Sequence, residues 1–111
     1  MRKVDVYMND VKAGKLTEMH PGKDYTFSYD KLYLASDNPP ISVTLPKRKE
    51  PYEAEHLFPF FTNMLPEGAN RKVICRTHKI DENDFFGLLT VMADQDFIGA
   101  VNIRHASDDE N

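Results

Sequence analysis

The sequence predicts a small α+β domain. An N-terminal antiparallel meander and a C-terminal strand would form one small sheet or a partly open barrel, with two or three helices packed between them. Residues 3–46 show the period-two alternation of half-buried strands, whereas residues 57–92 carry apolar residues at helical spacing. The last apolar run, residues 97–103, follows the helices and must return to the first sheet to satisfy its backbone hydrogen bonds.

The first three strands are the clearest elements. Residues 3–8 alternate apolar and polar side chains, and residues 11–19 form the expected partner strand. The asparagine–aspartate pair at residues 9–10 tolerates positive φ, which predicts a tight hairpin turn. A His-Pro-Gly stop at residues 20–22 then leads into residues 25–29, where aromatic and hydroxylated side chains alternate. We therefore expect three consecutive antiparallel strands.

Two weaker strand segments are predicted before residue 46. The first is a short piece at residues 32–34, and the second is residues 41–45, where Ile, Val and Leu alternate with Ser and Thr. Pro40 and Pro46 bracket the second segment, which favours an edge position because proline cannot donate a ladder hydrogen bond. Gly99 in the C-terminal strand predicts a bulge or close packing.

Three helices are predicted in the second half of the chain. The first carries an apolar stripe made of Leu57, Phe60, Phe61, Met64 and Leu65. It should begin at residues 54–56, with Pro59 in its first turn, and end before Pro66. A second short helix should carry residues 71–75, and the third should start at Asp81 as its N-cap.

Composition narrows the possible functions. A formal net charge of −4 argues against direct nucleic-acid binding, and the short basic cluster at residues 47–49 predicts a solvated loop. The lone cysteine, Cys75, gives no disulfide signature, and no apolar run approaches the roughly 18 residues of a membrane span. We therefore expect a cytoplasmic protein without a membrane segment, made of one domain at residues 1–104 and a mobile acidic tail at residues 105–111.

The sequence contains no recognisable catalytic constellation. Its four histidines are widely spread: His20, His56, His78 and His105. Their spacing does not gather ligands around one metal. Cys75 has basic neighbours but no evident base with an orienting partner, and no glycine-rich phosphate loop is present in the sequence. We therefore expect no enzymatic activity and no cofactor.

The segment FFTNMLPEG at residues 60–68, followed by Arg71, is the best candidate for function. Most of its apolar residues are explained by core packing, with the Pro-Glu-Gly sequence serving as a turn. Asn63, Glu67 and Arg71 are not core residues by default. Polar groups gathered at a rigid turn are well placed to bind another protein. The segment is therefore interpreted either as a purely structural turn or as a protein interface.

Several motifs, taken in order, resemble a known family. VDVYMND, YTFSYD, PPISVTLP, FFTNMLPEG with its downstream arginine, DFFGLL and GAV follow one another as in the N-terminal subdomain of the HipA family of serine/threonine kinases. The resemblance runs from about Val4 to Ile103, and FFTNMLPEG is its most specific part. The sequence departs from the family pattern at Ala93, where glycine is common, and at Phe97, where a small residue is common.

The resemblance implies a function without catalysis. In that family the kinase core lies C-terminal to this region, so we expect a stand-alone counterpart similar to the HipS-type antitoxins of HipBST toxin–antitoxin systems. Such a protein would bind and inhibit a separate HipA-like, HipT-type kinase. The contact implied by homology consists of Phe61, Asn63, Met64, Leu65, Pro66, Glu67, Gly68 and Arg71.

Two other readings of the resemblance remain open. The chain would alternatively be an obligate structural subunit of a split HipA-like kinase that supports its activity, or an unrelated adaptor that reuses the domain. In the toxin–antitoxin reading, a helix-turn-helix DNA-binding protein is a further partner, reached through the complex and not through direct DNA contact by this chain.

Overall fold

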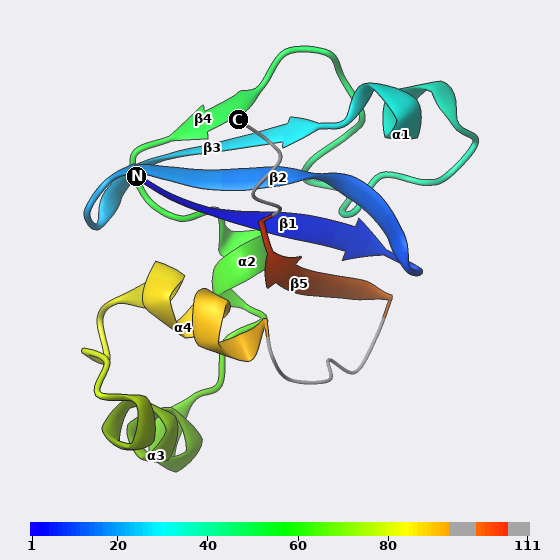
Figure 1. Cartoon of the computed structure of the whole chain (residues 1–111). Helices are drawn as coiled ribbons and strands as arrows, with labels where there is room; N and C mark the ends of the chain where they lie inside the picture. The colour runs from blue at the N-terminus through cyan, green and yellow to red at the C-terminus, as the bar shows by residue number, and fades with distance from the viewer. Residues whose placement is uncertain (94–99, 107–111) are drawn as a thin grey trace.

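A five-stranded antiparallel sheet organises the computed structural model, which describes residues 1–93 and 100–106. The strand order is β4-β3-β2-β1-β5, and within the described residues the sheet is open, with β4 and β5 at its edges (Figure 1). The strands are β1 (Arg2–Met8), β2 (Val11–His20), β3 (Lys23–Tyr29), β4 (Tyr52–Ala54) and β5 (Val101–His105). The predicted α+β class, with a meander and a returning C-terminal strand, is confirmed.

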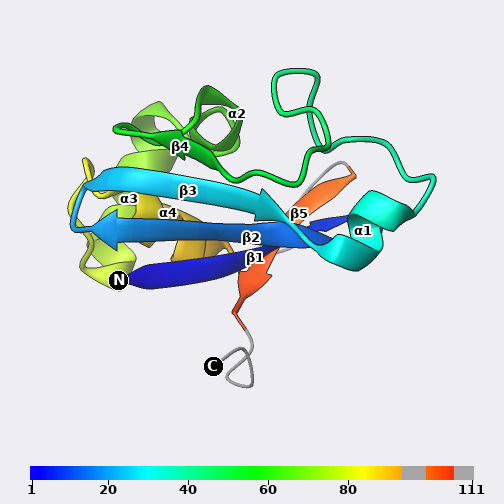
Figure 2. The ribbon, with the colours of Figure 1, turned by 90° about the horizontal axis from the view of Figure 1, so that it is seen from above.

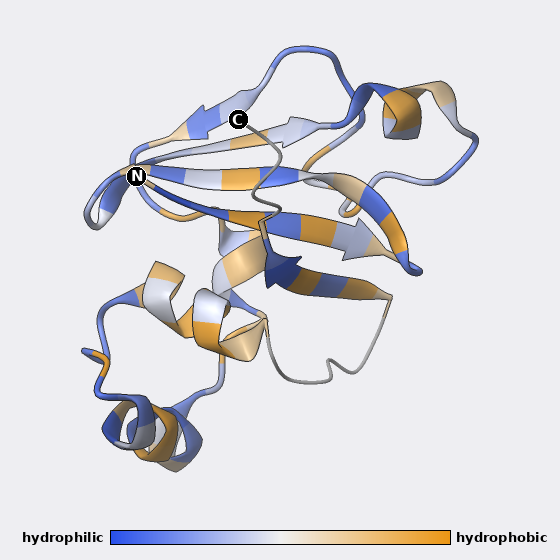
Figure 3. Ribbon diagram, in the orientation of Figure 1, coloured by the Kyte–Doolittle hydropathy of each residue, from blue (hydrophilic) through white to orange (hydrophobic). Residues whose placement is uncertain are grey.

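The first hairpin follows the prediction closely. Asn9 and Asp10 both adopt positive φ, at 50° and 67°, which matches the right-handed twist of the flanking strands. Hydrophobic and hydrophilic residues alternate along β1 and β2 in Figure 3. The register shifts between Val6 and Tyr7, which pair with Gly14 and Lys12, so one extra residue of β2 forms a bulge there.

The core lies between one face of the sheet and the helices α2 and α4, which cover that face (Figure 2). Val4, Leu16 and Phe27 are in register across β1, β2 and β3 and are fully buried. Phe61 of α2 packs on Phe27 with ring centroids 5.8 Å apart. Burying one such side chain contributes about 1.5–3 kcal/mol, so this layer is the main source of stability.

The other face of the sheet is polar but holds one buried carboxylate. Asp5 is 2% exposed, and its side chain lies 3.7 Å from the Lys12 ammonium and 3.8 Å from that of Lys15. Asp5 alternates with Val4 and Val6 as the period-two pattern predicts, so it points away from the apolar core. Cationic side chains, and not the apolar layer, compensate its burial.

Two predicted strand segments are wrong. Residues 32–34 belong to the short helix α1 (Lys31–Ala35). Residues 41–45 form a turn closed by a bridge between Ser42 and Leu45. Ile41 and Leu45 pack in the core, and the Tyr29 hydroxyl holds the backbone beside them by accepting from the Ile41 amide and donating to the Leu45 carbonyl. Val43 at the tip is 91% exposed. The apolar alternation therefore marks two anchors of a loop.

The predicted helix over residues 54–65 is also wrong in extent. Ala54, within its proposed start at residues 54–56, is the last residue of β4, which pairs with β3, and α2 covers only Pro59–Thr62. Pro59 stands at the first helical position, where its missing N–H costs nothing, so the helix cannot extend upstream. Leu57 and Leu65 are buried from the loops on either side of α2, which imitates a longer helical stripe.

The last two helices are α3 (Gly68–His78) and α4 (Phe85–Met92). The N-cap of α4 is Asp84, whose carboxylate accepts from the Gly87 amide at 3.0 Å, and not the predicted Asp81. Asp81 instead accepts from the Asn83 amide at 2.8 Å and shapes the preceding turn. Ala93 ends α4 in the right-handed helical region, so this position does not require glycine.

Some predictions concern residues outside the described ranges. These are the start of the C-terminal strand, including Phe97 and Gly99, and the tail at residues 107–111. β5 continues to His105, one residue beyond the predicted domain boundary. Within the described part of the chain, no helix combines the length and apolarity needed to cross a bilayer.

Candidate functional site

The turn between α2 and α3 is pinned to the core from within. Phe61 is 0% exposed and Leu65 is 5% exposed, so these two predicted contact residues hold the turn in place and offer almost no surface. The Leu65 amide donates to the Thr62 carbonyl at 3.1 Å, which closes the end of α2. Gly68 starts α3 at a φ of 58°, a conformation that favours glycine.

Arg71 joins this turn to the two helices that follow. Its Nε donates to the Pro66 carbonyl oxygen at 2.9 Å, and its guanidinium lies 5.4 Å from the centroid of the Phe85 ring. Arg71 is half-buried, so part of the residue still reaches the surface. The arginine that follows FFTNMLPEG therefore stiffens the turn while remaining available at its surface.

The remaining predicted contact residues lie at the surface of the turn. Asn63, Glu67 and Gly68 are exposed, whereas Met64 and Pro66 are partly buried. Polar groups next to partly exposed apolar atoms on a rigid backbone suit a protein interface, because little conformational entropy is lost on binding. We define the docking turn as Asn63, Met64, Pro66, Glu67, Gly68 and Arg71.

Helix α3 adds a surface that the sequence prediction missed. Cys75 is its one buried residue, and Figure 1 shows the helix standing off from the sheet. Lys72, Val73 and Arg76 are exposed, and Val73 keeps 58% of its surface. The sequence does carry a signal for this surface, because residues 68–78 contain no acidic residue and only a short apolar stripe.

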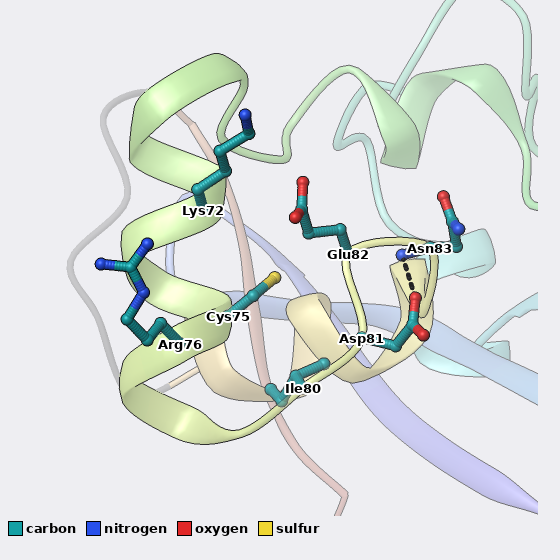
Figure 4. A pocket seen from close by; sticks show the side chains of 7 residues that line it. All are labelled: Lys72, Cys75, Arg76, Ile80, Asp81, Glu82 and Asn83. Atoms are coloured by element: carbon teal, nitrogen blue, oxygen red, sulfur yellow. Dashed lines mark hydrogen bonds between the residues drawn. The ribbon is translucent and has the colours of Figure 1, made fainter.

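A cavity of about 670 Å³ lies between α3 and the loop that leads to α4 (Figure 4). Its lining is Lys72, Cys75, Arg76, Ile80, Asp81, Glu82 and Asn83. Burial raises the pKa of the Cys75 thiol, which disfavours the reactive thiolate. No group of three His, Cys, Asp or Glu side chains in the described ranges could hold a metal ion.

The densest charged cluster ties α4 to the sheet. Arg2 donates to Glu18 at 2.7 Å and to Asp84 at 2.8 Å, and the Tyr25 hydroxyl donates to Glu18 at 3.1 Å. Burial, and then the Glu18 charge, raise the pKa of Tyr25 to about 12. Every member is engaged by another, so the cluster fits a structural clamp better than a catalytic centre.

The basic cluster at residues 47–49 is largely used by its own loop. Lys47 donates to the carbonyls of Ser36 and Asn38. Arg48 donates to the Glu50 and Pro51 carbonyls, with its guanidinium 3.7 Å from the centroid of the Tyr52 ring. These contacts order the long connection between α1 and β4 and favour the reading of a loop over that of a phosphate site.

Comparisons with known proteins agree with the fold and the motifs. The chain is 31% identical over 104 residues to an uncharacterized protein of Haemophilus influenzae, covering 94% of this chain and 92% of that protein. It is 32% identical over 90 residues to a Sinorhizobium fredii protein named "Putative kinase Y4mE", covering 80% of this chain but 21% of that longer protein.

Structural and family comparisons point the same way. A solved structure titled N-terminal domain of HipA toxin superposes with a TM-score of 0.72 at 25% identity, covering 97% of this chain and 95% of that chain. Residues 4–104 match the model of the family described as HipA N-terminal domain. The chain therefore belongs to the HipA N-terminal domain family.

Proposed function

We propose that this chain is a non-catalytic protein-binding domain that binds a separately encoded HipA-like serine/threonine kinase and inhibits it, as an antitoxin does. The observation that carries the proposal is the docking turn: exposed polar groups held rigidly by Phe61, Leu65 and the Arg71–Pro66 hydrogen bond. The HipA N-terminal domain is itself a non-catalytic domain, which supports a role in binding.

Inhibition requires no chemistry from the bound domain. A kinase must position ATP phosphates and close its lobes around them before phosphoryl transfer. A small domain docked on one lobe prevents that closure or occupies the cleft. The proposed compartment is the cytoplasm, where a kinase finds ATP, and a helix-turn-helix protein would join through the kinase and not through DNA contact by this chain.

A second function has its own supporting observation. In the Sinorhizobium fredii relative named "Putative kinase Y4mE", the region that matches this chain makes up about one fifth of a longer protein. The same domain as a separate chain would then be an obligate structural subunit that completes a split kinase and supports its activity.

The first experiment is a phosphorylation assay on a HipA-like kinase that lacks this domain, with and without the chain. Inhibition is expected as the chain is titrated in. A kinase that becomes active only when the chain is present would instead establish the structural-subunit function. An unchanged rate together with no complex would contradict both functions.

The docking turn is tested by the double variant E67A/R71A. It should weaken kinase binding about tenfold or more, because arginine is among the residues enriched at interface hot spots, and truncating one hot-spot residue costs about 2 kcal/mol or more. Isothermal titration calorimetry measures the affinity, and a thermal melt checks the fold. The control is E50A, which removes an exposed carboxylate from the loop before β4 and should bind normally. Equal affinities for both variants would place the interface elsewhere.

A further inference from the structure

The outer face of α3 is an unusual surface for this chain. The whole protein has a formal net charge of −4, yet residues 68–79 contain five basic or histidine side chains and no acidic one. Cationic residues near a helix C-terminus are favoured by the helix dipole, but Lys72 lies in the first half of α3. Helix stability alone therefore does not account for this concentration of positive charge.

Four exposed residues share one side of the helix. Ala69, Lys72, Val73 and Arg76 follow the i, i+3, i+4, i+7 spacing that places side chains on a single face. Cys75 and the half-buried Ile74 pack toward the core, and Cys75 lines the cavity together with Lys72 and Arg76, which stand at the cavity's rim. We call these four residues the outer face of α3; an apolar valine lies between two cations on it.

The two cations of this face are not used by the fold. The described residues form no ion pair or hydrogen bond with the Lys72 ammonium or the Arg76 guanidinium, whereas Arg2 and Arg104 are each paired. Figure 4 shows Lys72 and Arg76 on α3 and Glu82 on the opposite loop of the cavity. A basic face whose two cations make no ion pair with the described residues is complementary to an acidic partner surface.

The outer face also continues the docking turn. Glu67 and Gly68 of that turn lead directly into the first turn of α3, without an intervening segment. A partner that contacts the docking turn would therefore meet Ala69, Lys72 and Val73 next along the same edge of the molecule. Continuity of this kind enlarges one interface and does not create a second one.

We propose that the outer face of α3 docks on an acidic protein surface of the kinase partner. Carboxylates of the kinase would pair with Lys72 and Arg76, and an apolar depression between them would receive Val73. This inference rests on the proposed function. A protein is favoured over nucleic acid because the formal net charge of −4 disfavours docking on a phosphate backbone, which is negatively charged along its whole length.

The test is charge reversal with a matched control. The variant K72E/R76E places two anions on the outer face, and K31E/K49E makes the same change in net charge at two exposed lysines outside α3. Dissociation constants and phosphoryl-transfer rates are measured with the kinase at low and high salt. We expect K72E/R76E to bind at least about tenfold more weakly than wild type at low salt, because facing like charges repel strongly. The control should bind within about twofold, as scattered surface charges act weakly.

The outcomes separate this surface from the proposed function. If K72E/R76E binds as tightly as K31E/K49E, the outer face is not the interface, while inhibition by the wild type would still support the antitoxin function. If the wild type activates the kinase and K72E/R76E loses both binding and activation, the surface stands and the inhibitory function fails. A wild-type chain that does not bind the kinase overturns both.

A nucleic-acid arm completes the test. A 20-base-pair duplex DNA is titrated into the wild type and K72E/R76E at the same low salt concentration. The expected result is no measurable binding by either protein. DNA binding by the wild type that K72E/R76E loses would show that the face recognises phosphates, and the acidic-protein proposal would be wrong.

Discussion

Gly14 shows how one residue decides the packing of the central strands. It lies next to the bulge in β2, between Val6 of β1 and Tyr29 of β3. A Cβ built on it would lie 2.2 Å from the Ser28 carbonyl oxygen, well inside contact distance. That oxygen belongs to the backbone and cannot rotate away, so the close approach of β2 and β3 requires glycine here.

The substitution G14A should therefore destabilise the domain by about 2 kcal/mol or more, since forced overpacking typically costs 1–3 kcal/mol and here it pushes two strands apart. Urea unfolding followed by circular dichroism measures the change. S28A is the control, because it changes the residue whose carbonyl oxygen lies nearest to Gly14 without adding an atom. If G14A and S28A unfolded at the same urea midpoint, the strands would accommodate the added methyl group without loss of stability.

Single residues also show how far the candidate site could be predicted. Asn63 and Glu67 were expected at the surface because polar side chains beside a Pro-Gly turn seldom enter a core, and both are exposed. Phe61 and Leu65 were assigned to the same contact by resemblance, but both are buried. A sequence motif includes every residue of a segment. It does not distinguish the buried residues that support a surface from the exposed residues that form it.

At the scale of elements, prediction succeeded where the signal was local. The β1–β2 hairpin is specified by alternation and by two residues that accept positive φ, all close in sequence. The prediction of a strand at residues 41–45 and of a helix at residues 54–65 is wrong because burial in these segments depends on partners that are distant in sequence. The Leu45 backbone is anchored by a hydrogen bond from Tyr29, and β4 exists because it pairs with β3. Periodicity reports burial, and it does not report which element causes it.

The attachment of α4 to the sheet is a second property of elements. Arg2 of β1 bridges Glu18 of β2 and Asp84, the N-cap of α4. The hydrogen bonds from Arg2 hold the pKa of Asp84 below its ordinary value of 3.8. A carboxyl with a depressed folded-state pKa stabilises the fold above its unfolded pKa, and this contribution is lost as pH falls through the folded value.

Replacing Arg2 with methionine should lower the free energy of unfolding at pH 7, and the difference from wild type should shrink as the solution is acidified below about pH 4. Urea titrations across pH 2.5–7 check this. R104M is the control, since Arg104 pairs with the highly exposed Asp10. If the difference in free energy of unfolding between R2M and wild type stayed constant down to pH 2.5, Arg2 would not stabilise the fold through its hydrogen bonds to Asp84.

At the scale of the whole molecule, the strand order places the first strand, β1, beside the last, β5. β1 is paired on both sides, with β2 along one edge and β5 along the other. β4 contributes only three residues and pairs only with β3. Protection of backbone amides should therefore fall from the centre of the sheet toward β4.

Native-state hydrogen exchange provides the measurement. Amides of Val4 and Val6 should exchange through the global unfolding of the domain, whereas amides of residues 42–45 and of β4 should exchange through smaller local openings. Denaturant dependence distinguishes the two classes, because global opening accelerates steeply with urea. Equal protection of Glu53 and Val4 would show that β4 is held as firmly as the sheet centre.

The pairing of β1 with β5 has a consequence for the order of protein synthesis. β1 is translated before the other four strands, yet one of its edges has no partner until residues 101–105 have been translated. Throughout that interval the nascent chain presents an open strand edge at residues 4–8, and such edges readily pair with other chains. The domain therefore cannot complete its sheet until residues 101–105 have been made. Slowing the ribosome late in the message would favour aggregation over folding.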